Sequence, residues 1–358
     1  MSSENRKVLV AMSGGVDSSA AAALLAKNGY ECIGCTLHLF DKETAILNTD
    51  RDCCFSSEIE DARAACDLLG IPHYVFDFRE EFNKNVIDEF IAVYKAGKTP
   101  NPCIECNRFM KFGRLYSIAE ELGCGYIATG HYARIDVCEN YFLLNKSFDS
   151  SKDQSYVLYF LNQKQLARTI FPLGGLSKED IRLFAERCGF DNAGKRDSQD
   201  ICFIPDGNRV AFFERYTGRK TEPGDIKDNS GKLLGRHKGL IRYTVGQHKN
   251  LGLISEVPLY VTALDAENNT ITVGTKEELM QNKCIVSDFH WISGKPPENK
   301  LRCTVRLRYR QPETEAVVYT DTRGIVHIET SEPRVVCPGQ SAVLYNGDTV
   351  LGGGKIIG

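Results

Sequence analysis

Residues 7–19, KVLVAMSGGVDSS, join an apolar run to a glycine-rich turn and the start of a helix. The run up to Met12 has the continuous hydrophobic pattern of a strand that is buried on both faces. From Ser18 to Asn28 the alanine-rich sequence predicts a helix. Because a buried strand that leads through glycines into a helix is the first unit of a helix-covered parallel sheet, this stretch predicts an α/β fold.

The strand and helix signals keep alternating through the first two hundred residues. Strand-like segments at Glu31–Phe40, His73–Phe78 and Tyr126–Thr129 are separated by helical patterns. Such alternation predicts a doubly wound parallel sheet that binds ligands at the carboxyl ends of its strands. We therefore expect residues 1–207 to form one α/β domain.

The pattern changes near Asn208. Turn signals such as Glu222–Asp225 and Asn229–Gly231 separate short segments of alternating apolar and polar residues, and the last part of the chain is nearly all short strands. We expect a small β-rich central domain at 208–282 and a C-terminal β-barrel at 283–358.

Composition and charge narrow the class of protein. Of 358 residues, 42% are hydrophobic and 25% charged. No apolar stretch reaches the roughly 18 residues that cross a membrane, and the N-terminus lacks the apolar run and cleavage site of a signal peptide. We therefore expect a cytoplasmic protein with no membrane partner, and we expect a monomer. In that compartment the 14 cysteines should be reduced thiols and not a disulfide scaffold.

The loop Ser13–Ser19 is suited to hold phosphate. Its two glycines let backbone N–H groups approach oxygens, the helix N-terminus adds a positive dipole end, and Ser13 and Ser18 offer hydroxyl donors. It lacks the Lys of a Walker A sequence, so a pyrophosphate fits better, and Asp17 is a candidate Mg²⁺ ligand. The alternative is a glycine turn that only starts a helix, which the strand–loop–helix context disfavours.

Two cysteine segments are the next informative features. In Thr99–Phe112 (TPNPCIECNRFMKF), two prolines keep the chain extended and place Cys106 at the predicted start of a helix, a position that lowers the pKa of a thiol. In Asp197–Asp206 (DSQDICFIPD), apolar and acidic residues flank Cys202.

The loop resembles the PP-loop of N-type ATP pyrophosphatases, and the chain as a whole resembles the tRNA-uridine 2-sulfurtransferases (MnmA/TrmU family). The resemblance also rests on TGHYA at 129–133, SKDQSY at 151–156, RYTVGQ at 242–247, RYRQ at 308–311 and PGQSAV at 338–343. It implies a PP-loop ATP pyrophosphatase and thiolation domain, then the central domain, then a tRNA-binding barrel.

The resemblance also implies roles for individual residues. Contacts to ATP fall on Ala11, Met12, Ser13, Gly14, Gly15, Val16, Asp17, Ser18, Leu37 and Gly130. Contacts to tRNA fall on Asn101, Pro102 and Cys103 at the target base, and on His131, Lys152, Asp153, Gln154, Arg308, Tyr309 and Gln340 elsewhere. Cys106 is the implied nucleophile and Cys202 the implied carrier of a persulfide sulfur.

The implied reaction is adenylation of the C2 oxygen of wobble uridine 34, followed by transfer of sulfur to C2 with release of AMP. ATP is required because AMP is a good leaving group at C2 of the uridine, whereas oxide is not. A Cys106–Cys202 disulfide is the expected product when the sulfur is released. The implied partners are tRNA, with the Lys, Glu and Gln isoacceptors expected, and a sulfur-donor protein such as a cysteine desulfurase or a sulfur relay.

The chain departs from the family at Cys103, where many members have Asp. Together with Cys106 and Cys202 this makes three candidate ligands, enough for a 4Fe–4S cluster with one open iron. A zinc site with a fourth ligand is a second interpretation, and a Cys103 that binds nothing is a third. The sequence leaves these open.

The C-terminal half carries a basic strand-like segment. Residues 208–358 hold 21 Lys+Arg against 17 Asp+Glu, a net of +4, whereas residues 1–207 hold 23 against 30, a net of −7. Within Leu301–Arg310, period-two alternation predicts one face with the four arginines Arg302, Arg306, Arg308 and Arg310. Such a face is either ordinary solvated surface or a phosphate contact, and the resemblance favours phosphate.

Two other functions compete with tRNA thiolation. A PP-loop ligase acting on a small molecule would need an amine site and would leave both cysteine segments unexplained. A metal-sensing or redox-sensing RNA-binding protein would use Cys103, Cys106 and Cys202 but leave the ATP loop without a purpose.

Overall fold

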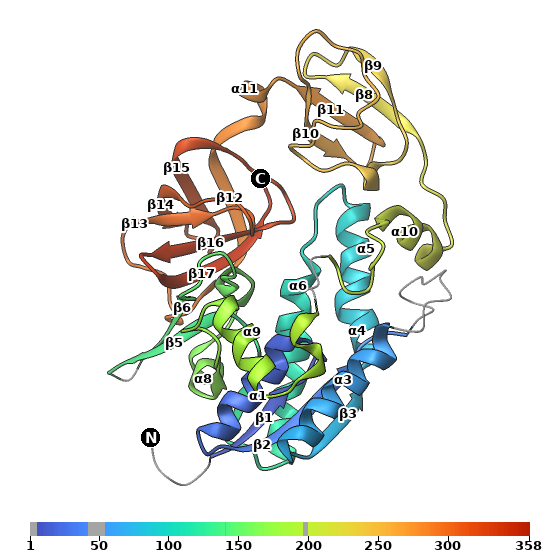
Figure 1. Cartoon of the computed structure of the whole chain (residues 1–358). Coiled ribbons are helices and arrows are strands. Elements are labelled where there is room, and N and C mark those ends of the chain that lie inside the picture. Colours follow the sequence, from blue (N-terminus) through green and yellow to red (C-terminus); the bar gives the residue numbers. More distant parts are fainter. Residues whose placement is uncertain (1–5, 42–53, 140, 196–199) are drawn as a thin grey trace.

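The computed structural model describes residues 6–41, 54–139, 141–195 and 200–358. Figure 1 shows an α/β unit from which a small sheet and a barrel extend, as the change of pattern near Asn208 predicts. No helix within these ranges is long and apolar enough to cross a membrane.

A five-stranded parallel sheet forms the centre of the α/β unit. Its strands lie in the order β3-β2-β1-β4-β7. They comprise β1 (Lys7–Ala11), β2 (Glu31–His38), β3 (His73–Asp77), β4 (Tyr126–Ala128) and β7 (Thr169–Ile170). Because β1 has its sequence neighbour β2 on one side and β4 on the other, the strand order reverses at β1, and the loop after it opens at this switch point.

The side chains of β1 alternate between the two faces of the sheet. Val8 and Val10 pack with the alanines of α1 (Val16–Lys27), whereas Leu9 packs with Leu115 and neighbouring side chains on the opposite face. Both faces are therefore covered, which confirms the doubly wound fold. The first face also holds α3 (Cys54–Leu69), α9 (Lys178–Arg187) and η4 (Asp191–Gly194).

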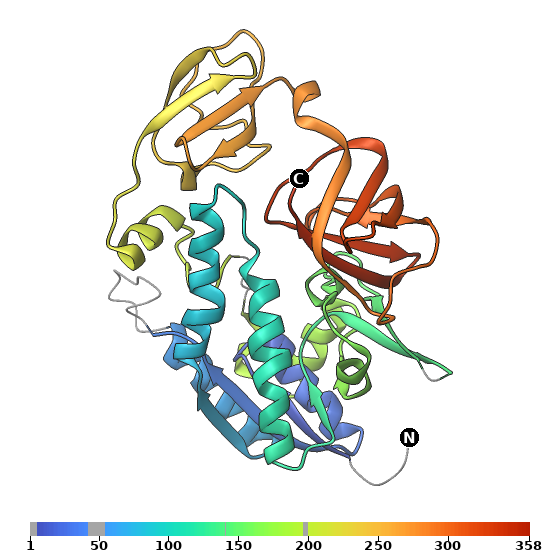
Figure 2. The ribbon, with the colours of Figure 1, turned by 180° about the vertical axis from the view of Figure 1, so that it is seen from behind.

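Two long helical rods lie side by side next to the sheet (Figure 2). One is built from α4 (Arg79–Phe82), η1 (Asn83–Ile87) and α5 (Asp88–Lys95), and the other from α6 (Pro102–Glu105), η2 (Cys106–Arg114) and α7 (Leu115–Glu121). In each rod the middle piece is a π-helix. The described part of the α/β unit also contains η3 (Ser155–Leu158) and α8 (Gln163–Ala167).

The central unit is a four-stranded sheet in the order β10-β11-β8-β9. Its strands are β8 (Gly224–Asp228), β9 (Leu233–His237), β10 (Tyr260–Asp265) and β11 (Thr270–Gly274). Its core is a small cluster around Ile226, Val261 and Ile271. The helix α10 (Arg209–Thr217) precedes the sheet, η5 (Leu240–Arg242) follows β9, and α11 (Lys276–Leu279) leads on to the barrel.

The C-terminal unit is a barrel of six strands that closes where β12 pairs with β17. The strands are β12 (Met280–Trp291), β13 (Leu301–Arg306), β14 (Thr314–Thr320), β15 (Val326–Val335), β16 (Ser341–Asn346) and β17 (Thr349–Ile356). The hairpin of β5 (Ala133–Cys138) and β6 (Tyr141–Lys146) extends this sheet through the pair Thr349–Asn145. A segment of the α/β unit is thus continuous with the barrel.

Candidate active site

The loop between β1 and α1 has a fixed shape. The backbone N–H of Ser13 donates to Ser18 Oγ (3.2 Å), and Ser18 Oγ donates to the Gly15 carbonyl (2.9 Å). From η4, the Asn192 amide donates to the Gly14 carbonyl (2.9 Å) and to Ser19 Oγ (3.0 Å). The loop is therefore preorganised, as a cradle for phosphate oxygens needs to be.

The residues expected at ATP come together at the carboxyl ends of three adjacent strands. Ala11 to Ser18 continue from β1, Leu37 lies near the end of β2, and Gly130 follows β4. Gly130 packs so closely on the start of α1 that an added Cβ would lie 2.9 Å from the Asp17 carbonyl carbon. The structure thus groups these residues around one edge of the sheet, and their contact with ATP stays a prediction.

Asp17 has partners that the sequence did not reveal. Lys178, at the first position of α9, places its Nζ 2.7 Å from Asp17 Oδ1 and 2.9 Å from Oδ2, and the Tyr132 hydroxyl donates to Oδ1 (2.7 Å). Lys178 is only 8% exposed. A buried ammonium group therefore lies beside the loop, although the loop's own sequence contains no lysine.

Cys106 and the residues flanking Cys202 meet at one hydrophobic cluster. Phe203 and Ile204 are buried in a cluster with Phe82, Phe90 and Met110, and Cys106 and Ile201 pack against it. The Phe203 ring packs edge-on against the rings of Phe82 and Phe90, with distances of 5.7 and 5.4 Å between ring centroids. This packing fixes the chain directly beside Cys202, whose side chain is exposed.

The helix that carries Cys106 begins earlier than the sequence predicts. It starts at Pro102 with Asn101 as its N-cap, and the Cys106 N–H already bonds to the Pro102 carbonyl one turn earlier. The expectation that a helix N-terminus lowers the pKa of Cys106 is therefore wrong. Loss of hydration instead raises the pKa of Cys106 to about 11.

The other two thiols follow the same trend. Cys103 and Cys202 reach the surface, yet the protein packed around their thiols removes enough water to raise both pKa values, and the charges of Cys106 and Cys103 raise that of Cys202 further. The positive charge of Lys111 acts in the opposite direction on all three pKa values.

The three thiols do not form a ready-made metal site. Within the ranges that the structure describes, no three His, Cys, Asp or Glu side chains are grouped closely enough to hold a metal ion. Cys103, Cys106 and Cys202 all belong to those ranges, whereas residues 197–199 of the second cysteine segment lie outside them. In the described residues this arrangement does not fit an iron–sulfur cluster or zinc.

Glu58, on α3, lies against the phosphate loop and also acts electrostatically on Cys202. Its backbone lies so close to Gly14 that an added Cβ there would come within 2.3 Å of the Glu58 carbonyl oxygen. Loss of hydration raises the pKa of its carboxyl group to about 7, with Lys195 opposing and Asp61 adding to this rise. The negative charge of Glu58 also contributes to the raised pKa of Cys202.

Several residues expected at tRNA have structural partners. His131 is 6% exposed, its Nδ1 lies 2.6 Å from Thr129 Oγ1, and burial holds its pKa well below the usual range. The Gln154 side chain accepts from the Tyr132 N–H (2.9 Å). Contact of these side chains with RNA stays a prediction.

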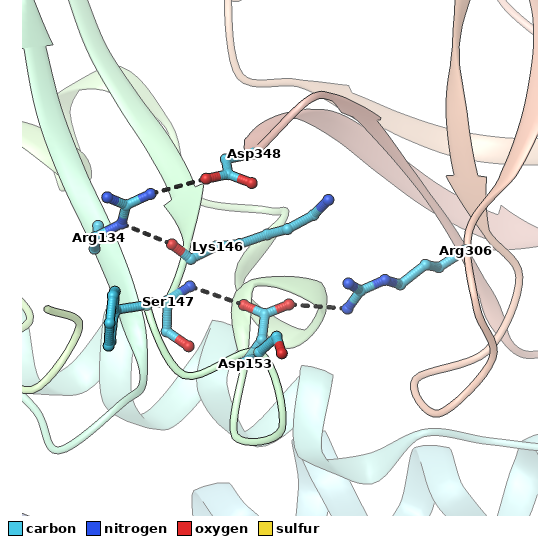
Figure 3. A pocket seen from close by; sticks show the side chains of 8 residues that line it. Arg134, Lys146, Ser147, Asp153, Arg306 and Asp348 are labelled. Carbon is cyan, nitrogen blue, oxygen red and sulfur yellow. Dashed lines mark hydrogen bonds and ion pairs between the residues drawn. The ribbon is translucent and has the colours of Figure 1, made fainter. Parts of the chain in front are cut away.

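Asp153 lies in a pocket of about 250 Å³ between the hairpin β5–β6 and the barrel. Figure 3 shows its carboxylate between the Ser147 N–H and the Arg306 guanidinium, which are 3.2 and 2.8 Å away. Lys152, the neighbour of Asp153, is half-buried. Because Asp153 is only 5% exposed, it is placed to shape the loop around Lys152.

The barrel residues expected at tRNA also bind other parts of the chain. Arg308 donates to the Val245 carbonyl (2.6 Å), the Tyr309 hydroxyl donates to the Asp153 carbonyl (3.1 Å), and the Gln340 amide donates to the Thr99 carbonyl (3.0 Å). Gln340 thus holds the segment that leads to Asn101, Pro102 and Cys103.

The expected arginine face is only partly formed. The strand β13 ends at Arg306, so Arg308 and Arg310 lie beyond it, and Arg306 pairs with Asp153 (2.8 Å) and Glu313 (3.0 Å). Arg302 and Arg310 are exposed. The sequence pattern was misleading because the acids that pair with Arg306 come from other elements.

Sequence reasoning missed Lys178, Tyr132, Asn192 and Glu58 as neighbours of the phosphate loop. Lys178 follows the helix cap Ser177, and nothing in that local pattern points toward Asp17, which is 161 positions away. Lys111 lies inside the segment Thr99–Phe112, where the local sequence indicates no role for it.

Comparison with known proteins accounts for nearly the whole chain. Residues 6–206 match the family model described as the tRNA methyl transferase HUP domain, 210–275 match its PRC-barrel domain, and 281–356 match the aminomethyltransferase beta-barrel domain.

Individual relatives agree with these matches. A protein of Caldanaerobacter subterraneus named tRNA-specific 2-thiouridylase MnmA 1 is 45% identical, with 98% of each chain covered. A protein of Moorella thermoacetica named tRNA-specific 2-thiouridylase MnmA is 46% identical, with 97% of this chain and 98% of that one covered. A solved 4-thiouridine synthetase–RNA complex with ATP is 19% identical over 58% of this chain and 50% of that one, with a TM-score of 0.35.

Proposed function

The chain belongs to the tRNA-specific 2-thiouridylase family, and we propose that it is an ATP-dependent tRNA-uridine 2-sulfurtransferase of the cytoplasm. The observation that carries the proposal is the meeting of Cys106 with the Cys202 segment at one cluster, with Glu58 lying against Gly14 of the preorganised phosphate loop and acting on Cys202. A small-molecule ligase would not need this pair of thiols, and a redox sensor would not need the loop.

The first step of the proposed reaction activates the uridine. The C2 oxygen of uridine 34 attacks the α-phosphorus of ATP, so that an O–P bond forms, the bond to pyrophosphate breaks and the N3 proton is lost. The loop Ser13–Ser18 holds the departing pyrophosphate with backbone N–H groups, and Lys178 offers a positive charge beside it. Mg²⁺ would neutralise phosphate charge. Asp17 is its candidate ligand, once the Asp17 carboxylate is released from its ion pair with Lys178.

The second step delivers sulfur. A donor protein with a persulfide group loads Cys202, and the terminal sulfur attacks C2, forming a C–S bond as the C–O bond to AMP breaks. The Cys106 thiolate then attacks Cys202 Sγ, which breaks the S–S bond, releases 2-thiouridine and leaves a Cys106–Cys202 disulfide. The two cysteines are oxidised as the transferred sulfur is reduced, and a thiol reductant reopens the disulfide.

The contacts to RNA remain proposals. We assign Asn101, Pro102 and Cys103 to the target base, because Asn101 and Pro102 line a pocket of about 280 Å³ at the start of α6. We assign Lys152 and Arg310 to the tRNA backbone. The isoacceptors for Lys, Glu and Gln are the proposed substrates, and the divisions 1–207, 208–282 and 283–358 are the proposed domains.

The test is formation of 2-thiouridine. Purified protein is incubated with ATP, Mg²⁺, a cysteine desulfurase with cysteine, and unmodified tRNA(Glu), and the nucleosides are analysed by mass spectrometry. We expect 2-thiouridine with the wild type and its loss with Cys202→Ser, with tRNA binding retained. Cys138→Ser, which removes an exposed cysteine on β5, is the matched control and should remain active. No product in air or after anaerobic iron reconstitution would refute the function.

A further inference from the structure

Lys111 shares a helix face with the two cysteines of α6 and η2. In an α-helix, residues five apart point about 140° away from each other. Residues 106–114 instead form a π-helix, whose hydrogen bonds run from i to i+5, so Lys111 lies one turn above Cys106 on the same side. Cys103, three residues before Cys106 across an α-helical turn, joins this face.

The segment that carries Cys202 reaches the same helix from a distant part of the sequence. Phe203 and Ile204 pack with Met110, the residue directly before Lys111, and Cys106 borders the same cluster. The packing therefore brings the Cys202 segment to the part of the π-helix that lies between Cys106 and Lys111.

The charges around this face are unbalanced. Lys111 is the positive charge that lowers the pKa of Cys103, Cys106 and Cys202, while Glu58, when ionised, raises that of Cys202. The other titratable groups that face the site are His131, which is buried and neutral, and Tyr309, which lies near Cys103. In the part of the chain that the structure describes, no carboxylate forms an ion pair with Lys111.

We propose that Lys111 is a charge-stabilising residue of the sulfur-transfer site, whose ammonium group stabilises the thiolate of Cys106 and the sulfur anion carried on Cys202. Lys111 makes and breaks no bond: each thiol gives its proton to solvent, and the ammonium group stays protonated. Because the surrounding protein disfavours thiolates here, a nearby cation increases the small fraction of each cysteine that is present as thiolate at a given pH. The part of the proposal that concerns sulfur transfer rests on the proposed function.

The rate of alkylation by iodoacetamide at pH 7, 8 and 9 tests the proposal without ATP or tRNA, because the thiolate is the form that reacts. Trypsin releases Cys202 as the sole cysteine of peptide 197–209, and in a Cys103→Ser background it releases Cys106 as the sole cysteine of peptide 99–108. Alkylation of each peptide is followed by mass spectrometry in wild type, Lys111→Met and Lys111→Arg. Lys95→Met, which removes an exposed lysine of α5, is the control.

We expect Lys111→Met to raise the pKa of both thiols and therefore to slow alkylation of both peptides about three- to tenfold at each pH. Lys111→Arg and Lys95→Met should match the wild type. An unchanged rate in Lys111→Met, or an equal decrease in Lys95→Met, would overturn the proposal. If Lys111→Met does not fold, the neutral variant Lys111→Gln replaces it. The expected decrease in rate, together with a wild-type protein that forms no 2-thiouridine, would refute the proposed function alone.

Discussion

Gly14 is the residue of the phosphate loop that tolerates a side chain least. Its φ is +74°, and an added Cβ would meet the Glu58 carbonyl oxygen at 2.3 Å. We expect Gly14→Ala to lower ATP-dependent activity about a hundredfold or more, because a displacement of about 1 Å has such an effect at a preorganised site. Pyrophosphate release with tRNA measures it. Gly175→Ala, which has open space around it, should behave as wild type, and equal losses in both would contradict this view.

His131 should make the stability of the protein depend on pH. Burial lowers its pKa in the folded state, so below the ordinary value of 6.5 the unfolded chain binds a proton that the folded chain does not. Stability should therefore fall as the pH drops below 6.5, by up to about 2 kcal/mol at pH 5 from this residue.

Chemical denaturation at pH 5.0 and 7.5 measures this contribution. His131→Gln keeps a hydrogen-bonding side chain near Thr129 but cannot titrate, so the difference between the two pH values should shrink in the variant. All other titratable groups are common to both proteins. An unchanged difference would show that His131 is not the source.

At the scale of elements, the barrel is fastened to the cysteine helix by an ion pair. Lys355 on β17 lies 2.8 Å from Glu89 on α5 and 3.1 Å from Glu105, which is 7% exposed and lies between the two cysteines of α6–η2. Removal of Lys355 leaves a buried carboxylate unpaired. We expect Lys355→Met to lower the free energy of unfolding by about 2 kcal/mol.

The double variant Lys355→Met with Glu105→Gln checks the cause of that loss. Because it removes the unpaired charge along with its partner, it should recover part of the lost stability in urea denaturation. Thiolation should recover in parallel if the pair positions Cys106. A double variant less stable than Lys355→Met would contradict this explanation.

Element type could be predicted from the sequence, but element boundaries could not. The buried run before Ser13 and the alternation after it predict the parallel sheet, because burial on two faces gives a distinct pattern. The helix of Cys106 begins at Pro102, a proline position typical of a first helical turn, and its π-helical register follows from packing that no local pattern records. That register determines which side chains face Cys106.

At the scale of the whole molecule, contacts between units could not be predicted from the sequence. The hairpin β5–β6 pairs with β17 through Asn145 and Thr349, which are 204 positions apart. Arg306 forms ion pairs with Asp153, which follows the hairpin, and with Glu313, which lies beyond β13. Such pairings depend on tertiary packing, which periodicity does not describe. The cysteines and the loop could therefore be identified from the sequence. Lys178, Lys111 and Lys355 could not, because only folding brings them next to the residues on which they act.

This pairing of charges limits how the molecule can attract tRNA. Since the chain has a net charge of −3 and acids pair with Arg306, we expect only a small number of phosphate contacts. We expect the logarithm of the tRNA affinity to fall with the logarithm of salt concentration with a shallow slope, equivalent to about three to five phosphate contacts. Arg310 is the exposed cation nearest in sequence to Tyr309, which bonds to the loop of Lys152.

Arg310→Ala should therefore weaken tRNA binding and reduce that slope by about one, as the loss of one phosphate contact does. Fluorescence anisotropy between 50 and 300 mM salt measures both quantities. Arg323→Ala removes an arginine that is 80% exposed on the turn between β14 and β15, so it changes the net charge equally and should leave the slope unchanged. Equal effects of the two variants would mean that net charge, and not a located contact, attracts the RNA.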